Sequence, residues 1–305
     1  MTVPGPPAAP PYRVLVTGAS GTIGRRTVDT LVEAGIGVTA VSVDGPGDWP
    51  APVRGLRIDA TDEAAMAEAM DGCEAIVHLA ALAHPSLGTP LRVFTNNVVS
   101  TFTVLTLAAQ GGIGRAVIAS SINASGINLN PHAPAPAYFP LDEDLPADIA
   151  DAYSLSKRVD ELSAAMVART WGLDVVALRF PLVKSPEELR SIGAETAQDP
   201  ASMMRTGWAY LTVDDAARAV LCALRAPLPG AHVIGVSAAD TLLDLPSEDL
   251  LDRYAPGVAR RRRFADREAL IDTTRARTLL GFEPAQSVHE FASAPGNGCG
   301  EGETH

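Results

Sequence analysis

Short apolar runs alternate with amphipathic segments over the first two thirds of the chain. The segments between the runs carry apolar residues three and four positions apart, as at Val28, Leu31 and Val32, which is typical of helices with one buried face. The apolar runs predict buried strands at residues 13–16, 38–43, 56–58, 75–79, 116–120 and 174–179. Strands that are apolar on both faces need cover on both faces, so the alternation predicts a parallel sheet between two layers of helices.

The alternation of apolar runs and amphipathic segments changes after Phe180. Residues 181–200 are polar and predict an irregular segment, while "WAYLTVDDAARAVLCAL" predicts a strand followed by a helix and "AHVIGVS" predicts a further strand. Two more helical patterns lie near Leu250 and Thr274. The predicted fold class is α/β: a Rossmann-type, doubly wound parallel sheet with a small, interleaved C-terminal lobe for the substrate.

The domain boundaries follow from these changes in pattern. Residues 12–181 form the predicted dinucleotide-binding domain, to which 208–236 return, whereas 182–207 and 237–292 form the small lobe. The two ends, 1–11 and 293–305, are rich in Pro or Gly and lack apolar periodicity, so disordered tails are predicted there.

Composition narrows the classes of function. A chain of 305 residues with 47% hydrophobic content can bury a full core, and a net charge of −12 argues against nucleic acid and anionic membrane surfaces as partners. Three widely spaced cysteines indicate neither a disulfide framework nor a zinc site, and no metal is expected. No apolar run is long enough to span a membrane, and the N-terminal residues do not resemble a signal peptide. We therefore expect a cytoplasmic protein whose partner is a small molecule.

A glycine-rich turn follows the first predicted strand. In "VTGASGTIGRR", Gly18, Gly21 and Gly24 stand between an apolar run and a helical pattern. Glycines permit a tight turn and the close approach of backbone to a pyrophosphate, and the helix N-terminus supplies unpaired N–H groups. Glycine spacing alone is weak evidence, but here a strand precedes it and a helix follows, so the turn predicts a dinucleotide site.

The choice of dinucleotide depends on Asp44 and two arginines. Asp44 ends the second predicted strand, 20 residues beyond Gly24, where a carboxylate can bind the adenosine ribose hydroxyls. A carboxylate there repels a 2′-phosphate, so NAD is favoured. Arg25 and Arg26 could reach a 2′-phosphate, so NADP is not excluded.

Candidate catalytic groups occur in "DAYSLSKRVDEL" and "VIASSINASG". Tyr153 and Lys157 are one helical turn apart and share a face. A phenol with a pKa of about 10 is a poor base, but a neighbouring ammonium stabilises its phenolate, so that it can take a proton from an alcohol. Ser120 and Ser121 follow a buried strand, where a hydroxyl can hold the substrate oxygen or simply cap a loop.

Together these motifs resemble a known family. TGxxGxxG, the following Asp, "IDATD", "VHLAA", "NNV", "SS" and YxxxK occur in the order seen in the extended short-chain dehydrogenase/reductases, also called the NAD-dependent epimerase/dehydratase family. The resemblance covers about residues 12–291. It implies a Rossmann fold, bound NAD, and chemistry on sugars or related alcohols.

The resemblance also implies roles for individual residues. Ser121 would be the catalytic hydroxyl, Tyr153 the acid/base, and Lys157 the residue that binds the nicotinamide ribose and lowers the tyrosine pKa. The residues implied to contact the cofactor are Gly18, Ser20, Gly21, Thr22, Ile23, Gly24, Asp44, Asp59, Ala60, Leu79, Ala80, Ala81, Asn97, Tyr153, Lys157, Phe180 and Pro181.

The substrate residues are less well defined. The candidates are Ser121, Ile122, Asn123, His84 and Trp208. Lone histidines in loops are often incidental, and an aromatic residue ahead of a strand is often part of the core, so His84 and Trp208 have a second interpretation. The arginine that the family's nucleotide-sugar enzymes carry near position 208 is missing; Arg205 or the run at 260–263 could replace it, although that run is equally consistent with a solvated surface.

The predicted function is NAD-dependent hydride transfer at a secondary alcohol of a sugar, polyol or uronate. Dehydration is not expected, because Ser121 is followed by Ile122 and Asn123 rather than by acids. A nucleotide-sugar 4-epimerase that retains its NAD is the alternative, and a non-catalytic dinucleotide-binding regulator is less favoured. A homodimer is also expected from the resemblance. The apolar positions compatible with a dimer interface, or with packing on the sheet, are Val98, Phe102, Leu105, Leu162, Met166 and Val167.

Overall fold

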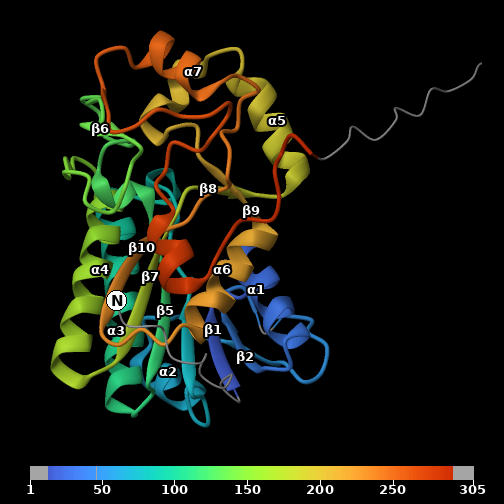
Figure 1. Cartoon of the computed structure of the whole chain (residues 1–305). Coiled ribbons are helices and arrows are strands. Elements are labelled where there is room, and N and C mark those ends of the chain that lie inside the picture. Colours follow the sequence, from blue (N-terminus) through green and yellow to red (C-terminus); the bar gives the residue numbers. More distant parts are fainter. Residues whose placement is uncertain (1–12, 46, 291–305) are drawn as a thin grey trace, which may run out of the picture.

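The central element is a seven-stranded parallel sheet with strand order β10-β7-β5-β4-β1-β2-β3 (Figure 1). The computed structural model describes residues 13–45 and 47–290, so both predicted tails lie outside the described residues. The strands are β1 (Arg13–Thr17), β2 (Gly37–Ser42), β3 (Arg54–Arg57), β4 (Ala75–His78), β5 (Arg115–Ser121), β7 (Asp174–Phe180) and β10 (Ala231–Gly235). The predicted fold class is confirmed, with the strands close to their predicted positions.

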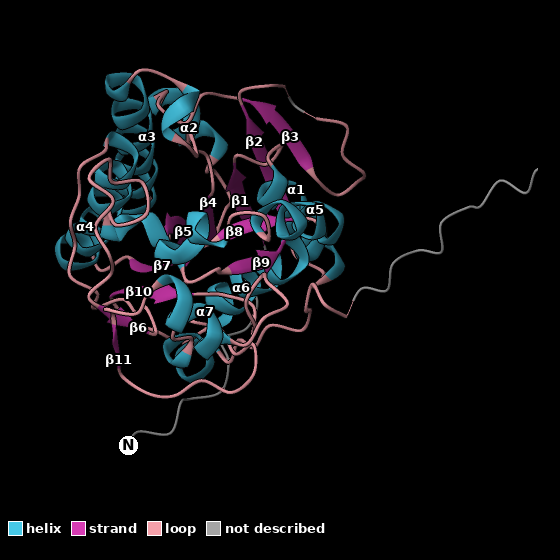
Figure 2. Cartoon of the chain, turned by 90° about the horizontal axis from the view of Figure 1, so that it is seen from above, coloured by secondary structure: helices cyan, strands magenta, loops and turns pink. Residues whose placement is uncertain are grey.

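Helices cover both faces of this sheet (Figure 2). The helices on one face are α1 (Thr22–Glu33) and α6 (Val213–Arg225); those on the other are α2 (Glu63–Ala69), α3 (Pro90–Gln110) and α4 (Ala152–Trp171). Strand β1 shows why the strands are apolar throughout. Val14 and Val16 pack in the core with α1 and α6, whereas Leu15 packs in the opposite core with α2, α3 and α4.

A smaller lobe lies beyond the carboxyl edge of the sheet (Figure 1). Its two small parallel sheets pair β8 (Leu182–Lys184) with β9 (Tyr210–Thr212) and β6 (Tyr138–Phe139) with β11 (Ala259–Arg260). Its longer helices are α5 (Pro186–Thr196) and α7 (Ser247–Tyr254). The chain returns from the lobe to the large domain through α6 and β10. Strand β9 lies inside the segment 208–236, which was predicted to return to the large domain, but it pairs with β8 of the lobe. None of the helices in the described ranges is long and apolar enough to cross a membrane.

The prediction of an irregular segment at 181–200 is wrong. It holds β8 and α5, and the short helix Pro200–Thr206 begins at its end. Helix α5 begins with a capping box: the Glu188 N–H donates to Ser185 Oγ (3.2 Å), and the Ser185 N–H donates to the Glu188 carboxylate (3.1 Å). Pro186 occupies the first helical turn, where its missing N–H has no cost. A helix start was therefore present in "SPEE", although the polar composition concealed it.

Candidate active site

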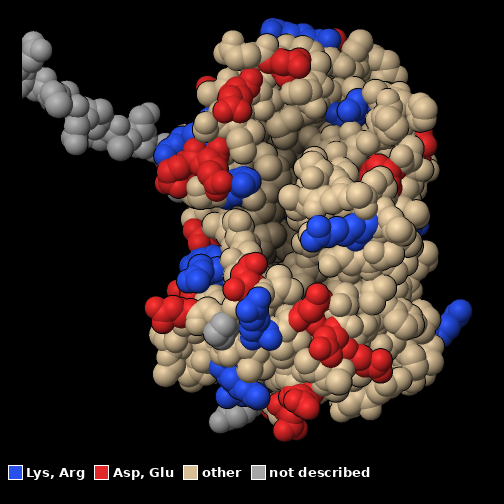
Figure 3. Space-filling model, turned by 180° about the vertical axis from the view of Figure 1, so that it is seen from behind, with Lys and Arg blue, Asp and Glu red and all other residues tan. Residues whose placement is uncertain are grey.

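A cleft of about 230 Å³ opens at the carboxyl ends of β1, β2 and β4. Nine residues predicted to contact the cofactor line it: Gly18, Ser20, Gly21, Asp44, Asp59, Ala60, Leu79, Ala80 and Ala81. Residues that the motifs did not indicate, among them Asn96 and Ser100 on α3, complete its wall. The space-filling view shows a face hollowed between the two parts of the molecule, with acidic and basic side chains scattered along the borders (Figure 3).

The glycine turn is tightly packed against its surroundings. Gly18 has a φ of +65°, and a Cβ atom there would lie 2.7 Å from the backbone nitrogen of Ala80. A Cβ atom on Gly24 would collide with the carbonyl oxygen of Gly18. Thr22, Ile23 and Gly24 form the first turn of α1 beside the cleft, and no side chain caps this helix. Its first N–H groups are therefore available to an anion such as a pyrophosphate, so these residues fit a dinucleotide.

Asp44 is held at the mouth of the cleft by Ser20. The Ser20 hydroxyl donates to the Asp44 carboxylate (2.8 Å) and lies 2.7 Å from the hydroxyl of Ser42. The Asp44 N–H donates to Ser42 Oγ (3.2 Å), which fixes the end of β2. This arrangement presents a carboxylate where ribose hydroxyls would be recognised.

The two arginines that left NADP open are engaged elsewhere. The Arg25 guanidinium stacks on the Trp49 ring, 4.6 Å from its centroid. Arg26 bonds Asp214 on α6 (2.5 Å) and Glu33 at the end of α1 (3.0 Å). In this arrangement neither guanidinium offsets the charge of Asp44, which favours NAD.

Asn97 does not line the cleft, contrary to its prediction as a cofactor residue. Its side chain is completely buried: Oδ1 accepts from the Leu82 N–H (2.8 Å), and Nδ2 donates to the Leu82 carbonyl (3.1 Å) and to Ser156 Oγ (3.1 Å). Asn97 on α3 thus holds the loop after β4 and helix α4 in place. Its neighbour in the sequence, Asn96, is the residue that lines the cleft.

Ser121, Tyr153 and Lys157 come from two adjoining elements. Ser121 is the last residue of β5, and its hydroxyl accepts from the Asn123 N–H (3.1 Å) at the start of the short helix Ile122–Ser125. Tyr153 lies in the first turn of α4, which Asp151 caps by accepting from the Ser154 N–H (2.8 Å). Lys157, one turn later, donates to the Ala119 carbonyl of β5 (2.9 Å), so it joins α4 to the strand that carries Ser121.

Phe180 and Pro181 follow on the next strand of the sheet. Phe180 pairs with Ser121 in the register of β5 and β7 and is buried in the core that α1 and α6 cover. Pro181 is half-buried between β7 and β8. Both lie at the carboxyl edge of the sheet, and neither lines the cleft, so their predicted contact with the cofactor stays a prediction.

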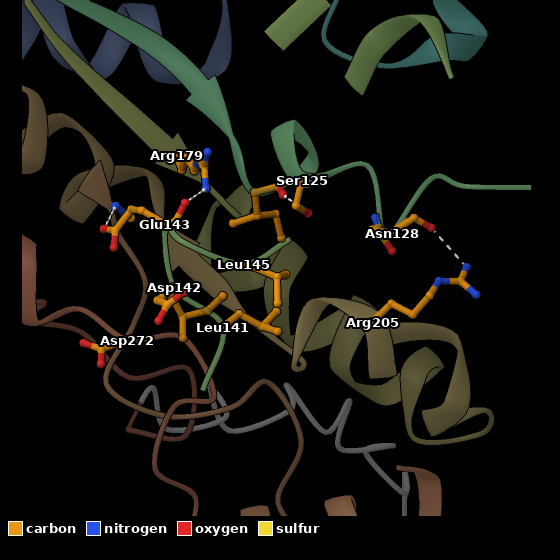
Figure 4. Close-up of a pocket in the computed structure, with 12 residues that line it drawn as sticks. Ser125, Asn128, Leu141, Asp142, Glu143, Leu145, Arg179, Arg205 and Asp272 are labelled. Atoms are coloured by element: carbon orange, nitrogen blue, oxygen red, sulfur yellow. Dashed lines mark hydrogen bonds between the residues drawn. The ribbon is translucent and has the colours of Figure 1, made fainter. Parts of the chain in front are cut away.

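A second, smaller cavity of about 30 Å³ lies at the junction with the lobe (Figure 4). Ile122 contributes to its wall, next to Ser121. Figure 4 shows Arg205, the proposed replacement for the missing arginine, donating to the Asn128 carbonyl (3.0 Å), and Arg179 donating to the Glu143 carbonyl (3.1 Å). Both arginines therefore already serve to hold loops at the junction with the lobe.

The remaining substrate candidates differ in position. The Asn123 side chain accepts from Asn128 Nδ2 (3.1 Å) beside Ser121. His84 is exposed in the loop after β4, where its Nδ1 accepts from the Ser86 N–H (3.2 Å). Trp208 is completely buried in the core of the lobe, and its indole N–H donates to the Pro200 carbonyl (2.7 Å). A ring with no exposed surface cannot stack on a ligand, so the prediction for Trp208 is wrong.

Comparisons with known proteins identify the family of this chain. The model of the NAD dependent epimerase/dehydratase family matches residues 14–235, which include the cleft and Ser121, Tyr153 and Lys157. The chain belongs to the NAD dependent epimerase/dehydratase family. This confirms the family predicted from the motifs, its NAD-dependent oxidoreductase or epimerase class, and NAD as the cofactor.

Relatives within the family have different activities. A UDP-glucose 4-epimerase of Corynebacterium glutamicum is 28% identical over 55% of the chain, and the match spans only half of that relative. A dTDP-glucose 4,6-dehydratase of Streptomyces niveus is 29% identical over 89% of the chain and 88% of the relative. An L-arabinose 1-dehydrogenase of Haloferax volcanii is 27% identical over 71% and 84%. The structure of a UDP-glucose 4-epimerase from Thermotoga maritima has a TM-score of 0.68 at 24% identity, covering 91% of this chain and 95% of that one.

Two buried ion pairs lie close to the Tyr153–Lys157 motif, one at Lys157 and one at Glu161. Burial opposes the charge on Lys157, but Asp160, Tyr153 and Glu161 together outweigh it and raise the lysine pKa. The Ser120 hydroxyl donates to Glu161 (2.7 Å), which also binds Arg179 through two bonds (2.8 and 3.0 Å). The motifs did not indicate this second network, although it buries an ion pair directly below Ser121.

His78, at the end of β4, is neutral in this environment. Its Nδ1 lies 2.8 Å from Thr17 Oγ1 and its Nε2 3.2 Å from Thr101 Oγ1. Burial lowers the pKa of His78 to about 3, and the Lys157 ammonium acts in the same direction. The imidazole therefore links β1 to α3 as an uncharged bridge.

This burial predicts a specific loss of stability in acid. The unfolded chain binds a proton at His78 below its ordinary pKa of 6.5, whereas the folded state takes it up only near 3, so stability falls as the pH falls through this interval. Between about pH 7 and about pH 5 the free energy of unfolding should drop by about 2 kcal/mol more for the wild type than for His78→Gln. Urea unfolding at the two pH values measures this difference. Equal losses in both proteins would contradict a neutral, buried His78.

Proposed function

We propose that this chain is an NAD-dependent oxidoreductase that oxidises or reduces a secondary alcohol of a sugar, polyol or uronate. The observation that carries the proposal is the position of Ser121, Tyr153 and Lys157 on β5 and α4, since β5 adjoins β4 and the residues after β4 line the dinucleotide cleft. Tyr153 takes the hydroxyl proton, Ser121 holds the same oxygen, and the Lys157 charge favours the phenolate. Bound NAD supplies the hydride acceptor at its nicotinamide ring.

Two observations favour a small substrate over a nucleotide sugar. Trp208, near the position of the arginine that the family's nucleotide-sugar enzymes carry, is completely buried. The basic run at 260–263 is largely neutralised by ion pairs. Arg260 pairs with Glu248 and Asp252, and the other pairs are Arg261 with Asp142 and Arg262 with Glu268. A diphosphate contact through Arg260, Arg261 or Arg262 would have to break these pairs.

An epimerase that retains its NAD is the second candidate. The UDP-glucose 4-epimerases among the relatives and solved structures support it. The similarity to a dehydratase does not lead us to propose dehydration, because the helix Ile122–Ser125, directly after Ser121, carries no carboxylate. Dehydrogenase and epimerase differ in cofactor use, since only the first needs a continuous supply of NAD.

A substrate panel distinguishes these two activities. Purified protein is given NAD, or NADP in parallel, with free sugars and uronic acids in one set and nucleotide sugars in the other, and NADH absorbance is followed. Accumulation of NADH with a free sugar or uronate supports the dehydrogenase. A nucleotide sugar that changes configuration without net NADH supports the epimerase. No reaction with either set would contradict the proposed substrate class.

We also propose a homodimer formed by α3 and α4. These helices carry most of the large exposed apolar side chains of the described residues: Leu91, Val99, Phe102, Leu155, Leu162 and Trp171. Of the positions predicted from the sequence, Phe102 and Leu162 are exposed. Leu105 and Val167 are instead completely buried against the sheet, and Val98 and Met166 are half-buried, so the face differs in part from the predicted one.

Leu162→Asp should convert the dimer to a monomer. Leu162 is 59% exposed, and a carboxylate at the centre of an apolar interface would be desolvated without a partner. Size-exclusion chromatography with light scattering measures the change, and Ala67→Asp, on the exposed side of α2, is the matched control. A wild-type monomer at high concentration, or a Leu162→Asp dimer, would contradict this interface.

The cytoplasm is the location we propose for this reaction. Cys73 and Cys222 are free thiols, which is compatible with a reducing compartment. Fractionation of cells that express the tagged full chain tests this location.

A further inference from the structure

Lys157 has a buried partner outside the family motif. Asp160 lies three residues later on α4, and its Oδ2 is 3.1 Å from the Lys157 ammonium. The two side chains are 5% and 1% exposed, respectively. The second oxygen of Asp160 is also buried, and the Thr101 hydroxyl of α3 supports the charge of this carboxyl. A carboxylate this poorly solvated interacts strongly with the one cation beside it.

The hydrogen bonds of Lys157 fix the direction of its ammonium group. An ammonium has three N–H donors. One donates to the Ala119 carbonyl and a second to Asp160, which leaves one donor uncommitted among the described residues. Without Asp160, only the Ala119 carbonyl would hold this group in place.

The other charged groups around the pair are already compensated. On α4, Glu161 is bound by Arg179 of β7 and by Arg158 (3.1 Å). From β4, His78 faces the pair as a neutral imidazole, α3 contributes the uncharged Thr101, and β5 contributes the Ala119 carbonyl. Burial raises the pKa of the Asp160 carboxyl, and the Lys157 ammonium offsets part of that rise. Asp160 is therefore the carboxylate bonded to Lys157, and Glu161 adds a smaller effect.

We propose that Asp160 is a positioning residue that holds the Lys157 ammonium in place and sets the pH at which Tyr153 releases its proton. The inference rests on the proposed function in one respect, namely that the Tyr153 proton is the one transferred. An ammonium alone strongly favours a neighbouring phenolate, and a carboxylate bound to that ammonium weakens the effect. Removing the charge of Asp160 while keeping its shape should therefore make Tyr153 ionise at lower pH.

The direct test is a phenolate titration of Asp160→Asn with NAD bound. Ultraviolet absorbance is followed against pH for the wild type and the variant, and each curve is corrected with the same protein carrying Tyr153→Phe. Tyr138 and Tyr210 interfere little, because burial raises the pKa of Tyr138 to about 12 and that of Tyr210 still further. The Tyr153 midpoint should fall by about one pH unit. Glu68→Gln on the exposed side of α2 removes one negative charge elsewhere and should leave the midpoint unchanged.

A purely structural role for Asp160 predicts a different result. The variant would then lose thermal stability but keep the wild-type Tyr153 midpoint, and this outcome overturns the proposal. If Asp160→Asn does not yield folded protein, Asp160→Ser removes the same charge from a smaller side chain and is held to the same criterion.

Measurements of turnover distinguish a failure of this inference from a failure of the proposed function. The acidic limb of the kcat/KM profile should move with the phenolate midpoint in Asp160→Asn, and an acidic limb that stays in place overturns the inference. The titration itself requires no substrate. A shifted midpoint in a protein that turns over no member of the panel would therefore retain the inference and reject the proposed function.

Discussion

Tyr153→Phe is expected to lower turnover by about three orders of magnitude while NAD still binds. The phenol is the acid/base of the proposed reaction, and phenylalanine removes only its hydroxyl. Tyr153 lies in a helix turn that Asp151 caps, and Lys157 is fixed by Ala119 and Asp160, so the surrounding structure does not depend on that hydroxyl. NADH absorbance measures turnover, and titration calorimetry measures NAD affinity.

Tyr254→Phe is the matched control for this substitution. Tyr254 lies at the end of α7 in the lobe, where its ring packs against Trp208, and loss of its hydroxyl should leave turnover unchanged. Retained turnover in Tyr153→Phe would contradict the role of Tyr153. Loss of both NAD binding and turnover would instead indicate a structural role for the hydroxyl.

Gly24→Ala should weaken NAD binding and lower stability. The added Cβ atom meets the carbonyl oxygen of Gly18, a backbone atom that cannot move aside without opening the turn. Overpacking of this kind costs about 1–3 kcal/mol in the free energy of unfolding. Because the same shift displaces the first turn of α1 from the cleft, we expect NAD affinity to fall by at least about tenfold, in line with an energetic cost of this size.

Gly114→Ala provides the comparison for this effect. A Cβ atom at Gly114, just before β5, meets no atom within 4 Å, and its φ lies outside the left-handed region. Denaturant unfolding and NAD titration of the two variants should therefore differ clearly. Equal NAD affinity in Gly24→Ala and wild type would contradict the assignment of this turn.

Much of the large domain could be predicted from local sequence. The runs around Leu15 and Val117 are apolar on both faces because helices cover both faces of the sheet, and such runs stand out in any sequence. Helix α5 was missed for the opposite reason. It is polar, and only Leu189 and Thr196 are buried, so its capping signal at Ser185 was the one local indication.

The candidate site shows a similar division. Gly18, Gly24, Tyr153 and Lys157 could be predicted because a fixed spacing defines each motif. Contacts between distant segments could not: His78 reaches Thr101, and Arg179 reaches Glu161, through packing that no local pattern encodes. The same limitation explains why Asn97 and Trp208 were predicted to contact a ligand. Their positions in the sequence were known, but their burial was not.

The most direct test of the central claim is a single-turnover measurement. Protein loaded with NAD is mixed rapidly with each member of the substrate panel, and reduced nicotinamide is followed by absorbance in wild type and Tyr153→Phe. Both a dehydrogenase and an epimerase must reduce the cofactor during the first turnover, so we predict reduced nicotinamide with at least one substrate in the wild type and none in the variant. No reduction in the wild type with any substrate, or equal reduction in both proteins, would contradict the account.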